Sequence, residues 1–381
     1  MNPDDFKDPE TGRLVPTLKG MAFVPNPLPP PRIDLAALVP LVSRAERALG
    51  ELSGIGRTLP NPYLLIRPFM RREAVASSKI EGTVTTLSQL LLFEVDEETN
   101  RAPGDAREVL NYVRALEHSL KRLDKLPVSA RLICEAHKIL LTNVPSERGA
   151  RIIPGEFRKD QNWIGAKLVE NARYVPPPPL DVPEAMSALE KYINGRDEDV
   201  PTLIQLALIH YQFEAIHPFP DGNGRVGRLL IPLILCARKE ISQPLLYMSS
   251  YFEKNYQGYI DRMLAISKMG HWTQWVSFFL EGIEESCKDA ITRAQSLQML
   301  QKSYYGKIQR ARSSALLGQL IELLFEHPAI TVPYAADRLQ ISYNAAKNNI
   351  GRLVEAKILR PSGGNNRPMV FVATDIVKLI G

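Results

Sequence analysis

The densest group of residues that could carry out chemistry lies at positions 217–228, with the sequence HPFPDGNGRVGR. Gly222 and Gly224 allow backbone amides to approach a ligand closely, and the helix expected after this loop directs its positive end to the same place. Arg225 and Arg228 are three residues apart, so both guanidinium groups lie on one face near that helix end. The segment therefore predicts a polyphosphate site with two bidentate clamps.

Two further side chains of this loop are suited to chemistry on a bound polyphosphate. Asp221 supplies the hard oxygen ligand that Mg²⁺ prefers in nucleotide sites. His217 has an ordinary pKa of about 6.5 and could take a proton from an attacking hydroxyl group. A base, a metal ligand and an anion site together indicate nucleotidyl or phosphoryl transfer.

Taken one at a time, these residues have ordinary structural explanations. A histidine before proline is usually a helix-terminal or core residue, Gly-Asn-Gly is usually a turn, and paired arginines usually form a solvated face. A dinucleotide-binding loop is excluded because the preceding element is predicted to be an amphipathic helix rather than a strand. A Walker-type loop is excluded since Gly-Lys-Ser/Thr is missing. The fixed order of twelve residues favours a functional site.

That order resembles the signature of the Fic family, HPFxDGNGRxxR, at every specified position. Fic proteins are enzymes that mostly transfer AMP from ATP to a hydroxyl side chain of a target protein. The resemblance implies that His217 is the general base and that Asp221 holds Mg²⁺. It assigns the main phosphate clamp to Arg225 and the γ-phosphate contact to Arg228. The ATP-binding residues implied for this segment are Asp221, Gly222, Asn223, Gly224, Arg225, Val226, Gly227 and Arg228.

Two further segments extend the resemblance. The sequences GEFR at 155–158, NWIG at 162–165 and VPP at 175–177 are similar to the family's flap, a β-hairpin that docks the target's backbone by strand addition. Ordinary hairpin packing would also account for the apolar residues there. Tyr256 and Tyr259 lie where the family places aromatic contacts to adenine, although Ile260 stands where many members have a second, adjacent tyrosine. The residues assigned to target docking are Asn162, Trp163, Ile164 and Gly165.

Residues 77–82, SSKIEG, match the family's inhibitory pattern, Ser/Thr-x-x-x-Glu-Gly/Asn. The pattern is short, and helices that end in Glu-Gly are common. Beside a full Fic signature it implies that Ser77 and Glu81 belong to an inhibitory helix at about 62–82. Glu81 would pair with Arg228 in the place of the γ-phosphate, so that ATP binds in an unproductive orientation. We therefore expect an autoinhibited resting enzyme.

The elements that position these residues are predicted to be mainly helical. Residues 1–33 are rich in proline and are expected to form an extended arm. Apolar residues then recur at helical spacing in the segments 34–52, 62–82, 87–94, 105–125, 130–142, 201–216, 225–238, 256–266 and 271–303. A break is expected at residues 53–56, and the flap at 154–175 is expected to be a short hairpin. The predicted fold class is a mainly α, Fic-type helical core with a small β-hairpin flap and a C-terminal winged helix-turn-helix domain.

The C-terminal residues 313–381 are predicted to form that separate domain. Short helices at 331–339 and 343–356 are joined by a three-residue turn, and two apolar segments flank a glycine-containing stretch, which resembles a winged helix-turn-helix domain. From Lys307 onward there are ten Lys or Arg and five Asp or Glu residues, so the whole net charge of +5 lies in residues 307–381, which include the end of the connecting helix. The basic residues Lys347, Arg352, Lys357, Arg360 and Arg367 would lie on the recognition helix and wing.

Composition sets the outer limits. A hydrophobic content of 45% and a charged content of 23% are globular averages, so wholesale disorder is excluded. Three cysteines without metal-like spacing exclude a disulfide framework or a zinc ribbon and favour a reducing compartment. The longest apolar run is about half of what a bilayer requires. A cytoplasmic protein without a membrane partner is expected.

These patterns predict a protein adenylyltransferase in four parts: residues 1–128 with the arm and the inhibitory helix, a Fic catalytic domain at 129–281, a connecting helix at 282–312 and the winged helix-turn-helix domain at 313–381. Its substrates would be ATP with Mg²⁺ and a Ser, Thr or Tyr hydroxyl of a target protein or of the chain itself. The alternatives are a DNA-binding regulator whose Fic core senses nucleotide, transfer of UMP or phosphate, and removal of AMP. The sequence leaves open a homodimer and DNA contact through the C-terminal domain.

Overall fold

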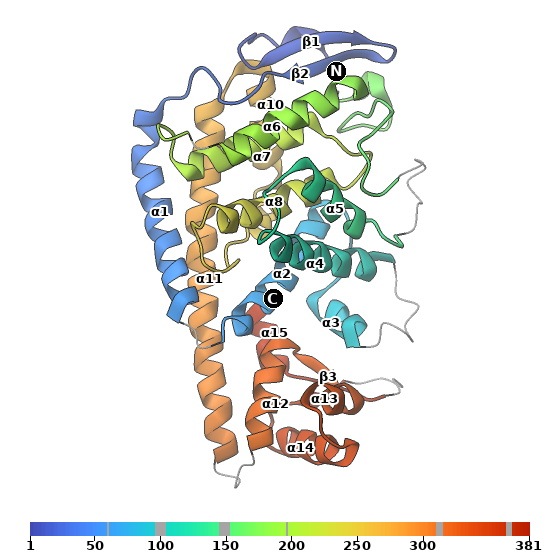
Figure 1. The fold of residues 1–381 in the computed structure, drawn as a ribbon, viewed down its shortest axis with the longest axis vertical. Helices are drawn as coiled ribbons and strands as arrows, with labels where there is room; N and C mark the ends of the chain where they lie inside the picture. Colours follow the sequence, from blue (N-terminus) through green and yellow to red (C-terminus); the bar gives the residue numbers. More distant parts are fainter. Residues whose placement is uncertain (59–60, 96–103, 145–152, 196, 310–314, 363–367) are drawn as a thin grey trace.

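The computed structural model describes the chain except for residues 59–60, 96–103, 145–152, 196, 310–314 and 363–367. The described part is mainly helical (Figure 1), which confirms the predicted mainly α class, and it contains a small antiparallel hairpin at residues 12–25. Two consecutive helices, α7 (Thr202–Ile216) and α8 (Asn223–Ala237), lie at the centre. The segment that carries the predicted chemistry joins them.

Helix α7 is buried almost all round, beyond the single apolar face that its sequence predicts. Its buried residues lie around the whole circumference and include the polar Gln205, His210 and Gln212, which is typical of a helix enclosed by others. Helices α6 (Val182–Asn194) and α11 (Trp272–Gln309) pack on it, and Nε1 of Trp275 donates to the Ala207 carbonyl at 2.9 Å. The loop at 217–222 therefore starts from a rigid base.

Helix α2 (Tyr63–Ile80) connects the site to the C-terminal part of the chain. It packs on α4 (Gly104–Arg122), α8 and α9 (Ser249–Lys254), and also on α12 (Ala315–Glu326). At its centre, the buried carboxyl of Glu73 accepts hydrogen bonds from the Tyr112 hydroxyl at 3.0 Å and from the Ser249 amide at 3.1 Å and hydroxyl at 2.5 Å. Burial raises the pKa of Glu73 in spite of these donors. The middle of α2 is thus fixed to both α4 and α9.

The prediction of an extended arm at residues 1–33 is wrong. Strands β1 (Gly12–Thr17) and β2 (Gly20–Pro25) form an antiparallel hairpin, in which Thr17 lies opposite Gly20. Gly20, directly after the turn residues 18–19, has a φ of +104°, which glycine adopts readily. Proline within β1 is tolerated because both strands of a two-stranded ribbon are edge strands.

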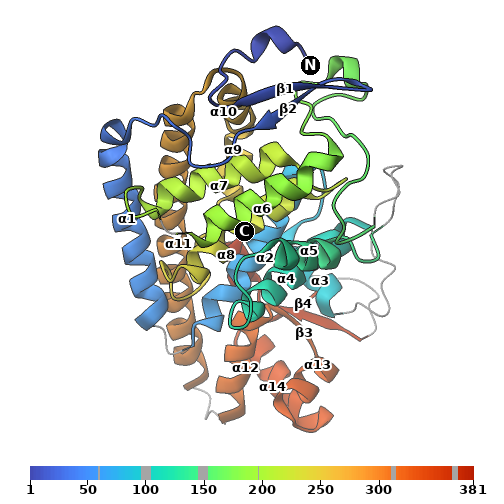
Figure 2. The same cartoon turned by 45° about the horizontal axis from the view of Figure 1, so that its top comes forward.

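The flap pairs less extensively than the predicted hairpin. Ile164 and Tyr174 form a single antiparallel bridge, with hydrogen bonds of 2.9 Å from Ile164 N to Tyr174 O and from Arg173 N to Ile164 O. Strand β2 lies beside this pair, because the Phe23 amide donates to the Val175 carbonyl at 2.9 Å. The N-terminal hairpin therefore supports the flap. Figure 2 shows the hairpin and the flap at the same end of the molecule.

The C-terminal unit, defined here as residues 315–381, combines helices with a small sheet. The three-stranded antiparallel sheet has the order β3-β5-β4. Thr331 and Ser342 cap the N-termini of two helices by accepting hydrogen bonds from backbone amides. Its elements are α12, β3 (Ala329–Thr331), α13 (Val332–Leu339), α14 (Tyr343–Glu355), β4 (Arg360–Pro361), β5 (Val370–Val372) and α15 (Thr374–Ile380). Arg367, expected on the wing, lies outside the described residues.

One predicted helix end differs in the structure. Helix α1 (Leu35–Thr58) continues through the expected break at 53–56, because Gly56 packs closely on Leu245 and such contacts outweigh a propensity cost of about 1 kcal/mol per glycine. Helix α11 continues from the expected catalytic domain into the expected connecting helix, as the helical pattern at 271–303 predicts. The remaining long helices are α3 (Leu87–Val95), α5 (Ala130–Leu140) and α10 (Tyr256–Met269). Within the described ranges, no helix is both long and apolar enough to cross a bilayer.

Candidate active site

The loop between α7 and α8 is held open by two residues with left-handed backbones. His217, at φ +50°, ends α7, and Gly222, at φ +79°, precedes α8. The Asn223 side chain closes the loop by donating to the Phe219 carbonyl and accepting from the Phe219 amide, both at 2.8 Å. Phe219 itself is fully buried. The loop thus brings His217 and the N-terminus of α8 to one space.

The imidazole of His217 is oriented as a proton acceptor. Its Nδ1 lies 3.3 Å from the Glu214 carbonyl oxygen, which can only accept, so Nδ1 carries the proton in the neutral ring. Burial, and secondarily the charge of Arg158, lower the pKa of His217 to about 4. At neutral pH the ring is therefore uncharged, with Nε2 available to take a proton.

Two buried side chains outside the signature hold this loop. Nε of Arg158 donates to the His217 carbonyl at 2.8 Å, and its backbone amide donates to the Pro218 carbonyl at 2.9 Å. His137 stacks on Phe219 with ring centroids 3.8 Å apart. Its Nδ1 accepts from the Gly155 amide at 2.9 Å, so its Nε2 donates to the Asp221 carbonyl at 3.0 Å. Burial lowers the pKa of His137 to about 4, which keeps this arrangement neutral.

The sequence contained only weak signals for these two residues. Arg158 stands in the GEFR segment that was assigned to the flap, and the structure places it under the loop instead. His137 reads as part of an apolar helical face. The clue available in the sequence is that His137 is a polar residue at a core position of its helix and has no charged partner in that helix.

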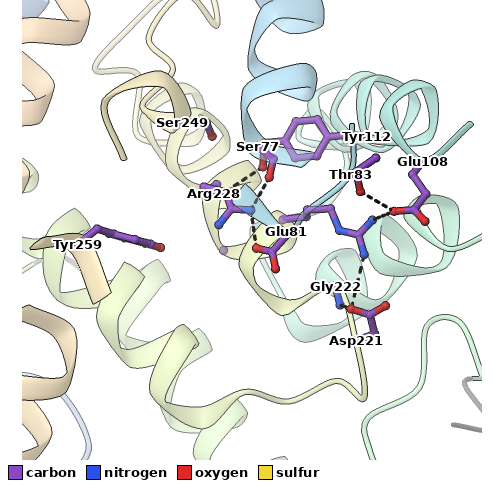
Figure 3. A network of polar contacts seen from close by, with 12 residues as sticks. Ser77, Glu81, Thr83, Glu108, Tyr112, Asp221, Gly222, Arg228, Ser249 and Tyr259 are labelled. Atoms are coloured by element: carbon purple, nitrogen blue, oxygen red, sulfur yellow. Dashed lines mark hydrogen bonds and ion pairs between the residues drawn. The ribbon is translucent and has the colours of Figure 1, made fainter. Parts of the chain in front are cut away.

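The inhibitory pattern meets the signature at Arg228. Nη2 of Arg228 donates to Oε1 of Glu81 at 2.7 Å and to the Ser77 carbonyl at 2.9 Å, and its Nε donates to the Ser77 hydroxyl at 2.9 Å (Figure 3). The side chain of Arg228 is 2% exposed. Gly224 makes the approach of Glu81 feasible, since a Cβ there would collide with Oε1. The C-terminal end of α2 thus packs against the first turn of α8.

Both members of this pair are charged. Burial alone would raise the pKa of Glu81, but the charge of Arg228 outweighs burial and the pKa is lowered. Burial also opposes the charge on Arg228, and the carboxylates around it, Glu81 foremost, raise its pKa above the ordinary value. An anionic group at this position is therefore strongly favoured.

The second arginine of the signature is bound differently. Arg225 is 1% exposed, and its Nη1 donates to Oε2 of Glu108 in α4 at 2.7 Å. Its Nη2 lies 3.6 Å from Oδ1 of Asp221, whose side chain is 24% exposed. Glu108 lies outside every motif recognised in the sequence, so sequence reasoning did not identify it.

A cavity of about 370 Å³ lies next to these residues. Its wall includes Glu81, Gly224, Arg228 and His217, together with the flap residues Ile164 and Gly165. Arg225 and Asp221 lie behind this wall rather than in it. The cavity is large enough for a small molecule that meets both His217 and the N-terminus of α8.

The two predicted adenine contacts both reach this cavity, from different depths. Tyr259 is 3% exposed, and its hydroxyl is 2.8 Å from Nε2 of His210. Tyr256 is 45% exposed at the rim. The carboxyl of Glu214 also faces the cavity; burial raises its pKa to about 8, and its Oε1 has no hydrogen-bond partner among the described residues.

The four predicted docking residues have separate surroundings. Nδ2 of Asn162 donates to the Phe219 carbonyl at 3.2 Å and so ties the flap to the loop. The Trp163 ring lies under the Lys19 ammonium at 4.9 Å, next to the N-terminal hairpin. Ile164 and Gly165 line the cavity. The flap thus forms one wall of the site.

Val226 and Gly227 lie inside the first two turns of α8. Val226 is fully buried and points away from the cavity into the core. Gly227 leaves space for the Glu214 carboxyl, with which a Cβ would collide. Neither lines the cavity, so the structure brings only Gly224 and Arg228 of the predicted ATP-binding residues in α8 to its wall.

Comparisons with known proteins were made on sequence and on structure. The Fic/DOC family N-terminal model matches residues 39–121, and the Fic/DOC family model matches residues 127–235. "Protein adenylyltransferase Fic" of Drosophila virilis is 31% identical over 162 residues, and that of Drosophila erecta is 30% identical over 164 residues. Each match covers 41% of this chain and 30% of the relative, so the chain matches less than a third of the length of these relatives.

The solved structures agree at the level of the fold. A Fic family protein from Desulfovibrio desulfuricans matches with a TM-score of 0.57 at 20% identity, covering 91% of this chain and 98% of that one. A Fic domain-containing signaling protein from Bacteroides thetaiotaomicron matches with a TM-score of 0.53 at 22% identity, covering 67% and 97%. With both family models matched in order and the signature loop in place, the chain belongs to the Fic/DOC family.

Proposed function

We propose that the chain is a protein adenylyltransferase, which transfers AMP from ATP to a Ser, Thr or Tyr hydroxyl of a target protein or of itself. One observation carries this proposal: the unprotonated Nε2 of His217 and the buried Arg228 border the same cavity. A general base beside an anion site is what transfer of a phosphorus-centred group to a hydroxyl requires. The Drosophila relatives are named for this activity.

We expect ATP to bind in the cavity in one orientation. Its phosphates would lie at the N-terminus of α8, where the helix dipole and Arg228 favour negative charge. Its base would lie towards Tyr256 and Tyr259, at the other side of the cavity. The residues 221–228 would then surround the phosphates as the family resemblance implies.

Asp221 fits the role of a Mg²⁺ ligand. No cluster of three or more His, Cys, Asp or Glu side chains suited to a metal occurs in the described part of the chain. Mg²⁺ in nucleotide sites is commonly held by one or two carboxylates together with the phosphates. Asp221, partly exposed in the loop before α8, supplies such a carboxylate. Bound there, Mg²⁺ would neutralise charge on the departing diphosphate.

The protein's own residues account for the rest of the reaction. His217 takes the proton of the target hydroxyl, whose oxygen then attacks the α-phosphorus of ATP. The bond from this phosphorus to the bridging oxygen breaks, and diphosphate leaves towards α8 and Arg228. The target's backbone would lie along the flap at Asn162, Trp163, Ile164 and Gly165.

Glu81 would keep this reaction slow in the resting protein. Its carboxylate takes the guanidinium group that the γ-phosphate needs, at 2.7 Å. Replacing Glu81 by Gly frees Arg228 without changing α8. We therefore expect Glu81→Gly to transfer AMP to itself or to added protein far faster than the unmodified chain.

Intact-mass analysis of the Glu81→Gly protein after incubation with ATP and Mg²⁺ tests the proposal. A gain of one AMP unit is expected, and the added His217→Ala change should lower its rate by about 10²–10⁴-fold, because it removes the base. A mass gain that survives His217→Ala contradicts the assigned chemistry. Parallel incubation with UTP reports on UMP transfer, a gain of one phosphate indicates kinase-like chemistry, and loss of AMP from a modified target indicates the reverse reaction.

A DNA-binding regulator remains the second candidate, on the strength of the C-terminal unit. The element order α12, β3, α13, α14, β4 and β5, in which the three strands form one antiparallel sheet, supports a winged helix-turn-helix assignment for residues 313–381. Exposed Lys357 and Arg360 lie beside this sheet. Binding to duplex DNA with a steep negative dependence of log K on log salt would support contact with phosphates.

The wider setting is also a proposal. We place the N-terminal part at 1–128, the catalytic domain at 129–281, the connecting helix at 282–312 and the winged helix-turn-helix domain at 313–381. Cys134, Cys236 and Cys287 are free thiols, which supports a reducing, cytoplasmic location. A homodimer is testable by sedimentation of the purified chain.

A further inference from the structure

Glu108 connects the phosphate end of the site to the inhibitory segment. It lies in α4, outside both the signature and the inhibitory pattern. Its Oε2 receives two hydrogen bonds, from Arg225 Nη1 at 2.7 Å and from the Thr83 hydroxyl at 3.2 Å (Figure 3). Thr83 is buried and follows Glu81 by two residues. One carboxylate oxygen thus joins the segment that carries Glu81 to the first arginine of α8.

The chain of contacts continues to the predicted Mg²⁺ ligand. On the other side of the guanidinium group, Arg225 Nη2 lies 3.6 Å from Asp221 Oδ1. The same oxygen accepts the Gly222 amide at 2.6 Å, immediately before α8. The orientation of the Asp221 carboxylate therefore depends on Arg225, and that of Arg225 depends on Glu108.

Glu108 differs from Glu81 in where it lies. Glu81 borders the cavity, in the place expected for a phosphate, whereas Glu108 does not border it and is 13% exposed behind Arg225. A carboxylate in the ligand's place competes with the ligand, and a carboxylate behind the guanidinium group orients it. The two glutamates therefore have opposite effects on nucleotide binding.

We infer that Glu108 is a positioning residue that holds Arg225 and, through it, Asp221 in the geometry that binds Mg²⁺ and the phosphates, and that its bond to Thr83 fastens the inhibitory segment. The inference rests on the proposed function in taking the ligand to be a nucleotide polyphosphate and in taking the segment that carries Glu81 to be inhibitory. Loss of the carboxylate charge leaves Arg225 buried without its strongest partner, so its orientation becomes ill-defined.

Ligand binding without turnover tests this role. In a Glu81→Gly, His217→Ala background, which frees Arg228 and prevents transfer, the Kd of Mg²⁺–ATP is measured by calorimetry and that of adenosine by ligand-observed NMR. Adding Glu108→Gln should weaken Mg²⁺–ATP binding by about tenfold or more, the usual effect of a lost charge-assisted hydrogen bond. Adenosine, which has no phosphate, should keep its Kd within about twofold.

A matched control exists in α3. Glu94 pairs with Arg71 at 2.8 Å, with side-chain exposures of 12% and 4%, close to the 13% and 1% of Glu108 and Arg225. Glu94→Gln removes an equally buried charge away from the site and should leave both Kd values unchanged. The inference is overturned if Glu108→Gln leaves Mg²⁺–ATP binding unchanged or tightens it, as a competitor would, or if adenosine binding falls equally.

The bond to Thr83 is tested separately in the otherwise unchanged chain. Thr83→Val removes the hydroxyl and keeps the shape, so the inhibitory segment loosens and basal transfer should rise about fivefold. Thr86→Val, which removes a hydroxyl bonded to Gln89 in the same connection, should not raise it. Unchanged labelling in Thr83→Val, in an experiment where Glu81→Gly raises labelling, overturns the fastening role. Because the binding experiment does not involve transfer, Glu108 can pass its test even if AMP transfer is not the reaction.

Discussion

The two ends of α2 are held by opposite kinds of partner. Near its C-terminus, Ser77 and Glu81 contact Arg228 of the catalytic core. In its first half, Arg71 contacts Glu94 of α3 at 2.8 Å and donates to the Glu326 carbonyl of the C-terminal unit at 2.8 Å. The helix is therefore fixed at one end to the site and at the other to the C-terminal unit.

The difference lies in what can replace each partner. Glu81 stands at the C-cap of α2, where the helix dipole disfavours negative charge by about 0.3–1 kcal/mol, so its position depends on Arg228. Arg228 has an alternative ligand, the phosphates of a nucleotide. Arg71 lies two turns inside the helix, and its partners belong to the folded chain. The C-terminal end of α2, with Ser77 and Glu81, can therefore be released when a nucleotide binds Arg228, and we call it the releasable end. The part around Arg71 stays bound within the folded chain, and we call it the retained end.

The largest expected effect comes from breaking the retained end. Arg71→Met keeps much of the side-chain volume but leaves the Glu94 carboxylate without its arginine. We expect the free energy of unfolding to fall by about 3 kcal/mol, measured by urea denaturation. The affinity for Mg²⁺–ATP in the Glu81→Gly background should be unchanged. A large loss of affinity in Arg71→Met would show that the two ends are not independent.

A smaller effect is expected from a change in pH. At the site, the neutral His217 lies near Arg158, and beside the C-terminal unit's first helix the neutral His327 lies near Arg71. Burial and Arg158 lower the pKa of His217 to about 4, and burial with Arg71 and Arg67 lowers that of His327 to about 2. A histidine that is neutral when folded and protonated when unfolded stabilises the fold above pH 6.5, and this stability is lost as the pH falls below 6.5. Each such histidine should remove about 1.4 kcal/mol from the free energy of unfolding between pH 7.5 and 5.5.

The variant His327→Gln isolates one of these contributions. It should lose about 1.4 kcal/mol less than the unmodified chain over that interval, by denaturation at both pH values. For the same reason, the transfer rate of Glu81→Gly should not decline around pH 6.5 but only as the pH approaches 4. An acid limb centred near 6.5 would mean that His217 titrates as an exposed histidine.

The smallest effect should come from weakening the releasable end. Ser77→Ala removes the hydroxyl bonded to Arg228 Nε, while the Ser77 carbonyl still accepts from Nη2. The loss of about 1 kcal/mol from the inhibited arrangement should raise basal AMP labelling about fivefold. Ser78→Ala, at a neighbouring buried serine, should leave labelling unchanged. Equal labelling in both variants would remove Ser77 from the inhibitory contact.

The sequence predicted the contact of Glu81 with Arg228 at the releasable end of α2, and it did not predict the contacts of Arg71 at the retained end. Glu81, Ser77 and the loop at 217–228 could be found because their order is fixed and local, and the Glu81–Arg228 contact followed from two short patterns. Glu108 and His137 carry no such pattern, since their partners lie far away in sequence and are set by helix packing. The N-terminal hairpin was missed because proline composition does not report that a two-stranded ribbon has free edges.

The length of helix α11 influences the distance between the catalytic site and the C-terminal unit, and so between molecules that would bind at these two places. It has 38 residues, which at 1.5 Å per residue gives a length of about 57 Å. It packs on α1 and α7 in its first part, on α15 near its middle, where Arg293 donates to the Leu379 carbonyl, and on α12 towards its end (Figure 1). A molecule bound to the C-terminal unit would therefore be held at a distance from the flap that depends on the length of this helix. One residue inserted into this helix would rotate its far end by about 100° and misdirect whatever is bound there.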